Sequence, residues 1–133
     1  MTHDFRHYSF TSLFSSDSYT DNILLVENDL SENQLLRAQQ LITYFNENAQ
    51  QIMLKIDELS QNWSFERIAK PERTALMLGI AELKMKLTPR KVVISEWVKL
   101  VDKNSSSDGA KFVNAILDNY CLLYTSPSPR DRY

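Results

Sequence analysis

Residues 35–59 read LLRAQQLITYFNENAQQIMLKIDEL, and this stretch decides the fold class. Its apolar residues recur at alternating steps of three and four, as Leu35, Ala38, Ile42, Phe45, Ala49, Ile52, Ile56 and Leu59. This spacing keeps one face of a single helix apolar for about seven turns. Because Leu36, Leu41 and Met53 widen the apolar stripe, we predict a core helix, with a coiled coil to a second chain as the alternative.

The periodicity also predicts structure before this helix. A short helix is expected over Phe5–Phe14, with one side formed by Phe5, Tyr8, Ser9, Ser12 and Leu13. A polar linker over residues 15–33 follows, and its apolar patch 23–26 is expected to dock on the body of the domain. Ser31 and Gln34 resemble a capping box that starts the long helix.

Four further helices are predicted after the long one. The first covers Phe65–Ala69, and the second runs from Pro71 to about Lys86. The third starts with Thr88 as its cap and Pro89 in its first turn, and the fourth is capped by Ser107 or Asp108. We expect the last three to bury Leu76, Ile80, Leu83 and Leu87, then Val93, Trp97, Leu100 and Val101, then Phe112, Val113, Ile116 and Leu117.

The composition of the 133 residues agrees with an all-α protein and excludes several functions. Only two glycines are present, too few for the turns of most sheet folds or for a glycine-rich phosphate loop. One cysteine and two histidines do not make a usual structural zinc site. The sequence shows no signal segment and no apolar run of about 20 residues. We expect a cytoplasmic protein without cofactors, metal or membrane contact.

The last residues, 121–133, read CLLYTSPSPRDRY and break the helical pattern abruptly. They look like the translation of a transposase-type sequencing adapter, with a natural disordered tail as the alternative. We therefore expect a single domain over residues 1–120 and a non-native or disordered tail over 121–133. On this interpretation Cys121 carries no information about the redox compartment, and the true C-terminus lies elsewhere.

Charge is distributed unevenly along the chain. Residues 1–62 have a net charge of −6, whereas residues 63–120 have +3. Lys84, Lys86, Arg90 and Lys91 surround one predicted turn, and Lys111 opens the last helix. If these helix ends lie together, they form a basic patch beside a helix N-terminus, which suits phosphate; solvated helix faces are the alternative.

Candidate catalytic groups are few. The two histidines lie near the N-terminus, and Glu96 is expected to pair with Lys99. Asn114 lies within the apolar sequence FVNAIL, so we expect its amide to be buried and to bond an adjacent helix, such as through Ser95. No set of residues indicates an enzyme.

Three blocks of the second half resemble one known family. They are ERTALMLGIAEL at 72–83, TPRKVVISEWVKL at 88–100 and KFVNAILD at 111–118. The last is similar to an F-V-N-G-V-L-D signature with Ala115 in place of its glycine, and RHYSFTSLF at 6–14 resembles a faint first helix. With these blocks the chain resembles the bacterial transcription antitermination factor NusB family.

The resemblance implies a compact all-α bundle of about six to seven helices. These would form two small subdomains, over residues 1–62 and 63–120. It also implies an RNA-binding factor rather than an enzyme: NusB-like proteins pair with ribosomal protein NusE and bind the boxA element of ribosomal RNA leaders. Other Nus factors and RNA polymerase would be indirect partners in transcription antitermination.

Carried over by position, the resemblance implies an RNA-facing set. This set consists of Arg6, His7, Lys86, Arg90, Lys91, Asp108 and Lys111. Family members usually carry several N-terminal arginines, whereas this chain offers Arg6 and two histidines. Fewer phosphate contacts weaken binding, so we expect poor binding of boxA-like RNA without NusE.

Two other interpretations remain open from the sequence. One is a NusB-like domain at the head of a truncated ribosomal RNA cytosine methyltransferase, although such domains usually read I-N-G-V-L-R where this chain has VNAILD at 113–118. The other is a helical oligomerisation module built on the long apolar seam. A stable dimer that binds neither RNA nor NusE would favour the second.

Overall fold

The computed structural model describes residues 4–14, 30–60 and 68–124, which form five helices and no strand. They are α1 (Phe5–Phe14), α2 (Glu32–Ser60), α3 (Lys70–Met85), α4 (Arg90–Asn104) and α5 (Ser107–Tyr124). The predicted all-α class is confirmed, with fewer helices in the described ranges than the six to seven expected. The apolar patch 23–26 lies outside the described residues, as does most of the helix predicted at 65–69, of which Ile68 and Ala69 are not helical.

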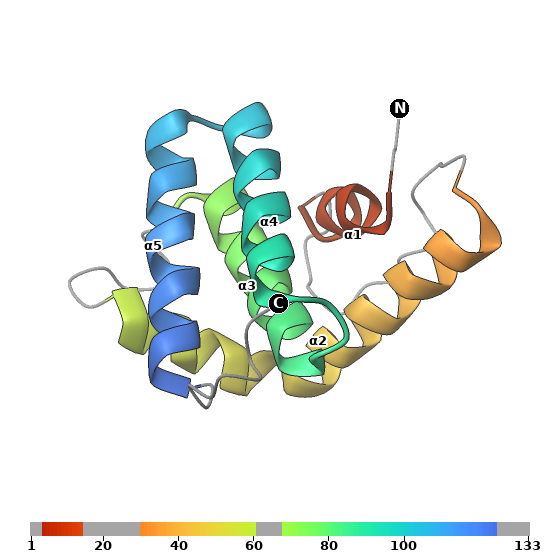
Figure 1. Ribbon diagram of the computed structural model, residues 1–133, viewed down its shortest axis with the longest axis horizontal. Helices are drawn as coiled ribbons and strands as arrows, with labels where there is room; N and C mark the ends of the chain where they lie inside the picture. The colour runs from red at the N-terminus through yellow and green to blue at the C-terminus, as the bar shows by residue number, and fades with distance from the viewer. Residues whose placement is uncertain (1–3, 15–29, 61–67, 125–133) are drawn as a thin grey trace.

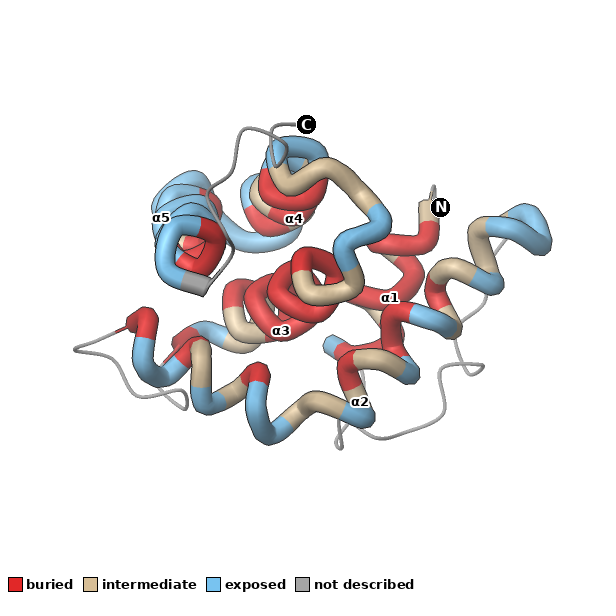
Figure 2. The backbone as a smooth tube through the Cα atoms, turned by 60° about the horizontal axis from the view of Figure 1, so that its bottom comes forward, coloured by how far each residue is buried: buried red, intermediate tan, exposed pale blue. Residues whose placement is uncertain are grey.

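Helix α3 lies at the centre of the molecule, with the other helices around it (Figure 1). Every residue from Thr74 to Leu83 is buried, so this helix is enclosed on all sides (Figure 2). Such all-round burial is typical of a helix in the core rather than on the surface. Helix α4 packs antiparallel to both α3 and α5, so that α3 and α5 run in the same direction, while α2 crosses the opposite side.

The long helix α2 buries the apolar seam that the sequence predicts. Six of its eight positions are buried, from Ala38 to Leu59, and the other two, Leu35 and Ala49, are half-buried against the core. Of the residues that widen the stripe, Leu41 is buried and Met53 packs on the core, but Leu36 is exposed. The seam faces α3 of the same chain, which confirms a core helix.

Helix α1 has the predicted bounds and is fixed by bonds at its first turn. The Asp4 carboxylate accepts the backbone N–H of His7 at 3.0 Å, which caps the helix. The Gln34 side chain accepts the backbone N–H of Phe5 at 2.9 Å, which ties α1 to α2. Ser31 accepts the N–H of Gln34 at 3.2 Å, so half of the predicted capping box forms and the Gln34 amide bonds α1 instead.

Two predicted helix starts are wrong by one residue. Helix α4 begins at Arg90 with Pro89 as its cap residue, and Thr88 makes no cap bond because its hydroxyl accepts from the Arg37 guanidinium at 3.2 Å. Helix α5 is capped by Ser106, whose hydroxyl accepts the Gly109 N–H at 2.9 Å, and not by Ser107 or Asp108. Pro71 does lie in the first turn of α3, as predicted.

Two burial predictions are also wrong. Asn114 is exposed on the outer face of α5, as is Ser95 on α4, so the amide does not link two helices in the core. Leu87 is 71% exposed because α3 ends at Met85 and the chain has already turned away from the core. Helix α5 continues four residues beyond residue 120, and Cys121 is buried on its inner side.

Candidate nucleic-acid interface

The predicted RNA-facing residues occupy both ends of α4 rather than one patch. Lys86, Arg90 and Lys91 lie at the turn where α4 begins, whereas Asp108 and Lys111 lie on α5 just after α4 ends (Figure 1). The 15 residues of α4 span about 22 Å. The start of α4 and the start of α5, which were predicted to lie together, are therefore at opposite ends of the α4–α5 pair. No single basic patch contains all the predicted residues.

Arg90 lies near the end of α5, where its charge affects Cys121. Burial raises the pKa of the Cys121 thiol, while the positive charge of Arg90 lowers it and the negative charge of Asp118 raises it. Arg90 thus lies beside the last turns of α5, as the antiparallel packing requires. Lys86 and Lys91 are exposed near it, with Lys86 in the left-handed conformation at a φ of 58° that ends α3.

Arg6 is buried in the core instead of facing solvent. Its guanidinium donates to both carboxylate oxygens of Glu82, with Nε–Oε1 at 2.9 Å and Nη2–Oε2 at 2.7 Å. The indole N–H of Trp97 donates to the same Oε1 at 2.9 Å. The side chains of Arg6 and Glu82 are only 9% and 4% exposed, so this triad joins α1, α3 and α4. The geometry favours a structural role for Arg6 over a phosphate contact.

His7 lies beside a shallow hollow between α1 and the second half of α4. This hollow of about 140 Å³ is lined by Asp4, Arg6, His7, Glu96, Lys99, Leu100 and Lys103. Lys99 and Lys103 are exposed and are basic residues that the sequence analysis did not place in the site. Their i, i+4 spacing on the polar face of α4 was the signal that could have found them.

The start of α5 is occupied by a carboxylate from α3. Glu72 is buried there and accepts a hydrogen bond from the Ser105 hydroxyl at 2.8 Å. A Cβ added to Gly109 would collide with the Glu72 carboxylate, so a larger residue here requires the Glu72 side chain to move. The predicted residues Asp108 and Lys111 are exposed on the outside of this turn. Because Glu72 already complements the helix N-terminus, that end is a poor phosphate site.

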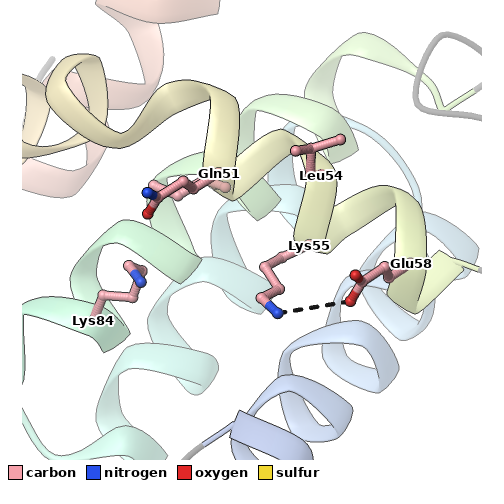
Figure 3. Close-up of a pocket in the computed structure, with 6 residues that line it drawn as sticks. Gln51, Leu54, Lys55, Glu58 and Lys84 are labelled. Atoms are coloured by element: carbon pink, nitrogen blue, oxygen red, sulfur yellow. Dashed lines mark ion pairs between the residues drawn. The ribbon is translucent and has the colours of Figure 1, made fainter.

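A second hollow lies between α2 and α3, with a volume of about 220 Å³ (Figure 3). Lys55 and Lys84 approach it from the two helices, and Leu54 lies at its edge. Lys55 pairs with Glu58 of the same helix at 3.7 Å. An exposed pair of this kind contributes little stability, and the hollow contains none of the residues predicted to face RNA.

Two further features, a metal-binding cluster and a membrane-spanning helix, are absent from the described residues. No group of three or more His, Cys, Asp or Glu side chains among them could bind a metal ion. None of the described helices has the length and apolar character needed to cross a membrane.

Comparisons with known proteins agree on one family. A model of the NusB family matches residues 5–121. A transcription antitermination protein NusB from Pediococcus pentosaceus is 39% identical over 62 residues, which cover 47% of each chain. That of Ligilactobacillus salivarius is 29% identical over 88% of this chain and 95% of its own.

A solved structure extends this similarity to three dimensions. It is a crystal structure of the antitermination factors NusB and NusE in complex with double-stranded RNA, and one of its chains superposes with a TM-score of 0.76. The identity is 26%, and the superposition covers 90% of this chain and 95% of that one.

Proposed function

The chain belongs to the NusB family, and from this premise we propose that it is an RNA-binding transcription antitermination factor. It acts with NusE on boxA-like single-stranded RNA of ribosomal RNA operons, in the cytoplasm, with other Nus factors and RNA polymerase as indirect partners. Its contribution is binding and positioning of RNA, and no step of covalent chemistry is assigned to it.

The observation that carries the proposal is the similarity over nearly the whole chain to a protein from a complex with NusE and RNA. Exposed cations on the described surface support it, because phosphate contacts supply most of the affinity of such proteins for nucleic acid. Lys99, Lys103 and Lys111 are all exposed on the part of the α4–α5 pair where α4 ends and α5 begins. Sequence preference would come from contacts with unstacked bases of a single strand.

The burial of Arg6 is a further reason to expect that RNA binding by this protein depends on NusE. The arginine nearest to the family's arginine-rich segment is held by Glu82 and is not available to a phosphate. The protein alone therefore has few N-terminal phosphate contacts, and its RNA affinity is expected to be low and only weakly dependent on salt.

A filter-binding titration tests this proposal. Binding of a short boxA RNA is measured at several salt concentrations with the protein alone, with NusE alone and with both together. We expect tight binding only for the pair. A matched RNA with a scrambled sequence is the control, and equal binding of the scrambled RNA by the pair would contradict a boxA-specific function.

A further inference from the structure

Three segments of the chain meet around a small hollow of about 20 Å³: the first turn of α1, the first half of α2 and the turn between α3 and α4. Phe5, Arg37 and Thr88 line it, one from each segment. A hollow of this size has room for no ligand larger than a water molecule. Its importance therefore lies in the bonds that these three side chains make with one another.

Arg37 of α2 connects the other two segments. Its guanidinium lies 4.1 Å from the centre of the Phe5 ring and donates to the Thr88 hydroxyl at 3.2 Å. Phe5 is buried, and its backbone N–H is held by the Gln34 side chain, so the first turn of α1 fixes the ring beside α2. The position of the Arg37 guanidinium thus depends on α1, and the position of Thr88 depends on Arg37.

The turn between α3 and α4 does not follow its own local preferences. Lys86 has a φ of 58°, a conformation that glycine adopts more readily than lysine. Thr88 and Pro89 have the pattern of a helix cap followed by a first-turn proline, yet Thr88 makes no cap bond. Pro89 has a helical φ of −55° but an extended ψ of 136°. A turn with these features needs contacts from outside itself, and Arg37 supplies one.

The local preferences describe a second arrangement of the same residues. Rotation of the Pro89 ψ from 136° to about −40° would start α4 one residue earlier, with Thr88 as its cap. The Thr88 hydroxyl would then accept the N–H of Arg90 or Lys91, neither of which bonds a described residue in the structure. Because this rotation swings Thr88 relative to α4, we expect the hydroxyl to serve either Arg37 or the cap.

We propose that Arg37 is a latch between α1 and the start of α4. While its guanidinium stacks on Phe5 it holds Thr88 and leaves α4 uncapped, and when the first turn of α1 moves, Thr88 is released and caps α4. Coupling between two surfaces requires an element with two discrete arrangements, and the Thr88 hydroxyl is that element. A partner that displaces the first turn of α1 would therefore change the start of α4, which carries Arg90 and Lys91. This inference goes beyond the proposed function and does not depend on RNA binding.

Nuclear magnetic resonance of the full chain, without any partner, tests the latch. Arg37→Met removes the bond to Thr88 and keeps an unbranched side chain against Phe5. The carbon chemical shifts of Pro89 should move towards helical values. Exchange of the Arg90 or Lys91 amide with solvent should slow by about fivefold, the population ratio that corresponds to a cap of ordinary strength.

The matched control is Lys84→Met, which removes a cation at the end of α3 that lines the hollow against the second half of α2 instead. It should leave both signals at their wild-type values. Arg37→Met/Thr88→Val separates the latch from a general loosening of the turn, because valine has the shape of threonine but no hydroxyl to form the cap. The double variant should therefore show neither the helical Pro89 shifts nor the slowed exchange.

Unchanged signals in Arg37→Met, or the same change in the double variant or in Lys84→Met, would overturn the proposal. Circular dichroism shows whether each variant folds. If Arg37→Met does not fold, Phe5→Leu takes its place, because leucine keeps an apolar side chain in the core but removes the ring on which Arg37 stacks. The Pro89 shifts and the amide exchange should then change in the same direction, and wild-type values in Phe5→Leu would equally exclude the latch.

Discussion

Arg6 shows how a residue placed by resemblance can have a structural role. The resemblance to the family, by position alone, implied a phosphate contact for it, whereas the structure buries its guanidinium against Glu82. Its partner Glu82 lies 76 positions away, and nothing in the local pattern indicates that the two meet. Trp97, 15 positions beyond Glu82, is equally remote from Arg6 in the sequence. Long-range polar pairs of this kind require the fold to be known first.

Arg6→Ala is expected to lower the free energy of unfolding by about 3–5 kcal/mol, because it leaves the Glu82 carboxylate buried without its cation. The double variant Arg6→Ala/Glu82→Gln should lose less than the sum of the two single variants, by about 1–3 kcal/mol. Urea denaturation followed by circular dichroism measures all three.

Glu96→Gln is the matched control, because Glu96 also pairs with a cation but at the surface. It should change the unfolding free energy by less than about 0.5 kcal/mol. Strict additivity of the Arg6 and Glu82 substitutions would show that their bond contributes nothing.

Gly109→Ala should destabilise the protein by about 1–3 kcal/mol, because the new methyl group collides with the Glu72 carboxylate. Gly109 does not have a positive φ, so the backbone itself would accept alanine. Thermal melts of the wild type and the variant measure the effect.

If this collision is the cause, removing the Glu72 carboxylate should cancel the destabilisation. In a Glu72→Ala background the same Gly109→Ala change should be neutral or stabilise by up to about 1 kcal/mol, because alanine favours a helix over glycine. Equal destabilisation in both backgrounds would rule out the steric explanation.

At the scale of elements, apolar periodicity predicted the helices well and their ends less well. The seam of α2 and the bounds of α1 are confirmed because burial of one face is a property of many residues at once. A cap depends on a single side-chain oxygen, and four consecutive polar residues, Ser105 to Asp108, could each have supplied it at α5. The prediction that Asn114 is buried was wrong for a related reason. Helix α5 is apolar on one side only, and Asn114 lies on its other, exposed side.

The identity of the α5 cap can be tested by comparing the stabilities of two serine-to-alanine variants. Ser106→Ala should cost about 1 kcal/mol, because the Gly109 N–H loses its acceptor. Ser107→Ala, one residue later and exposed, should change stability by less than about 0.5 kcal/mol. Chemical denaturation of the two variants in parallel decides between them, and the reverse order would restore Ser107 as the cap.

The candidate interface was only partly predictable at this scale. The sequence identified basic residues on both sides of α4, but the distance between them depends on α4 being a straight helix of 15 residues. The sequence did not indicate that Lys99 and Lys103 lie beside α1, because they occupy ordinary outward positions on that helix, where lysine is common. They become candidates only when α1 is seen to lie beside them.

The whole molecule combines the two predicted subdomains through α1. Helix α1 belongs to the first half of the sequence, yet Arg6 bonds Glu82 of the second half, while Gln34 of α2 holds the Phe5 N–H. Phe5 also stacks between guanidinium groups, with Arg6 at 4.5 Å and Arg37 at 4.1 Å from its ring centre. Residues 1–62 and 63–120 therefore share one core in the described structure.

We therefore predict a single cooperative unfolding transition for the whole chain. In a Trp63→Phe variant Trp97 is the only tryptophan, and its fluorescence reports the triad on α3 and α4. Its urea midpoint should coincide with that of the helical signal at 222 nm. Two separate midpoints would mean that the halves unfold independently.

The bond between Arg6 and Glu82 also sets an order of assembly during synthesis. A ribosome that adds about 5–20 residues per second needs roughly 4–15 s to make the 76 residues that follow Arg6. During this time α2 is made and can hold α1 through Gln34, but Glu82 of α3 and Trp97 of α4 do not yet exist. Its buried side chains, Phe5, Tyr8 and Leu13 among them, are then open to other apolar surfaces in the cell. The amino-terminal helix thus completes its packing only after most of the chain has been made.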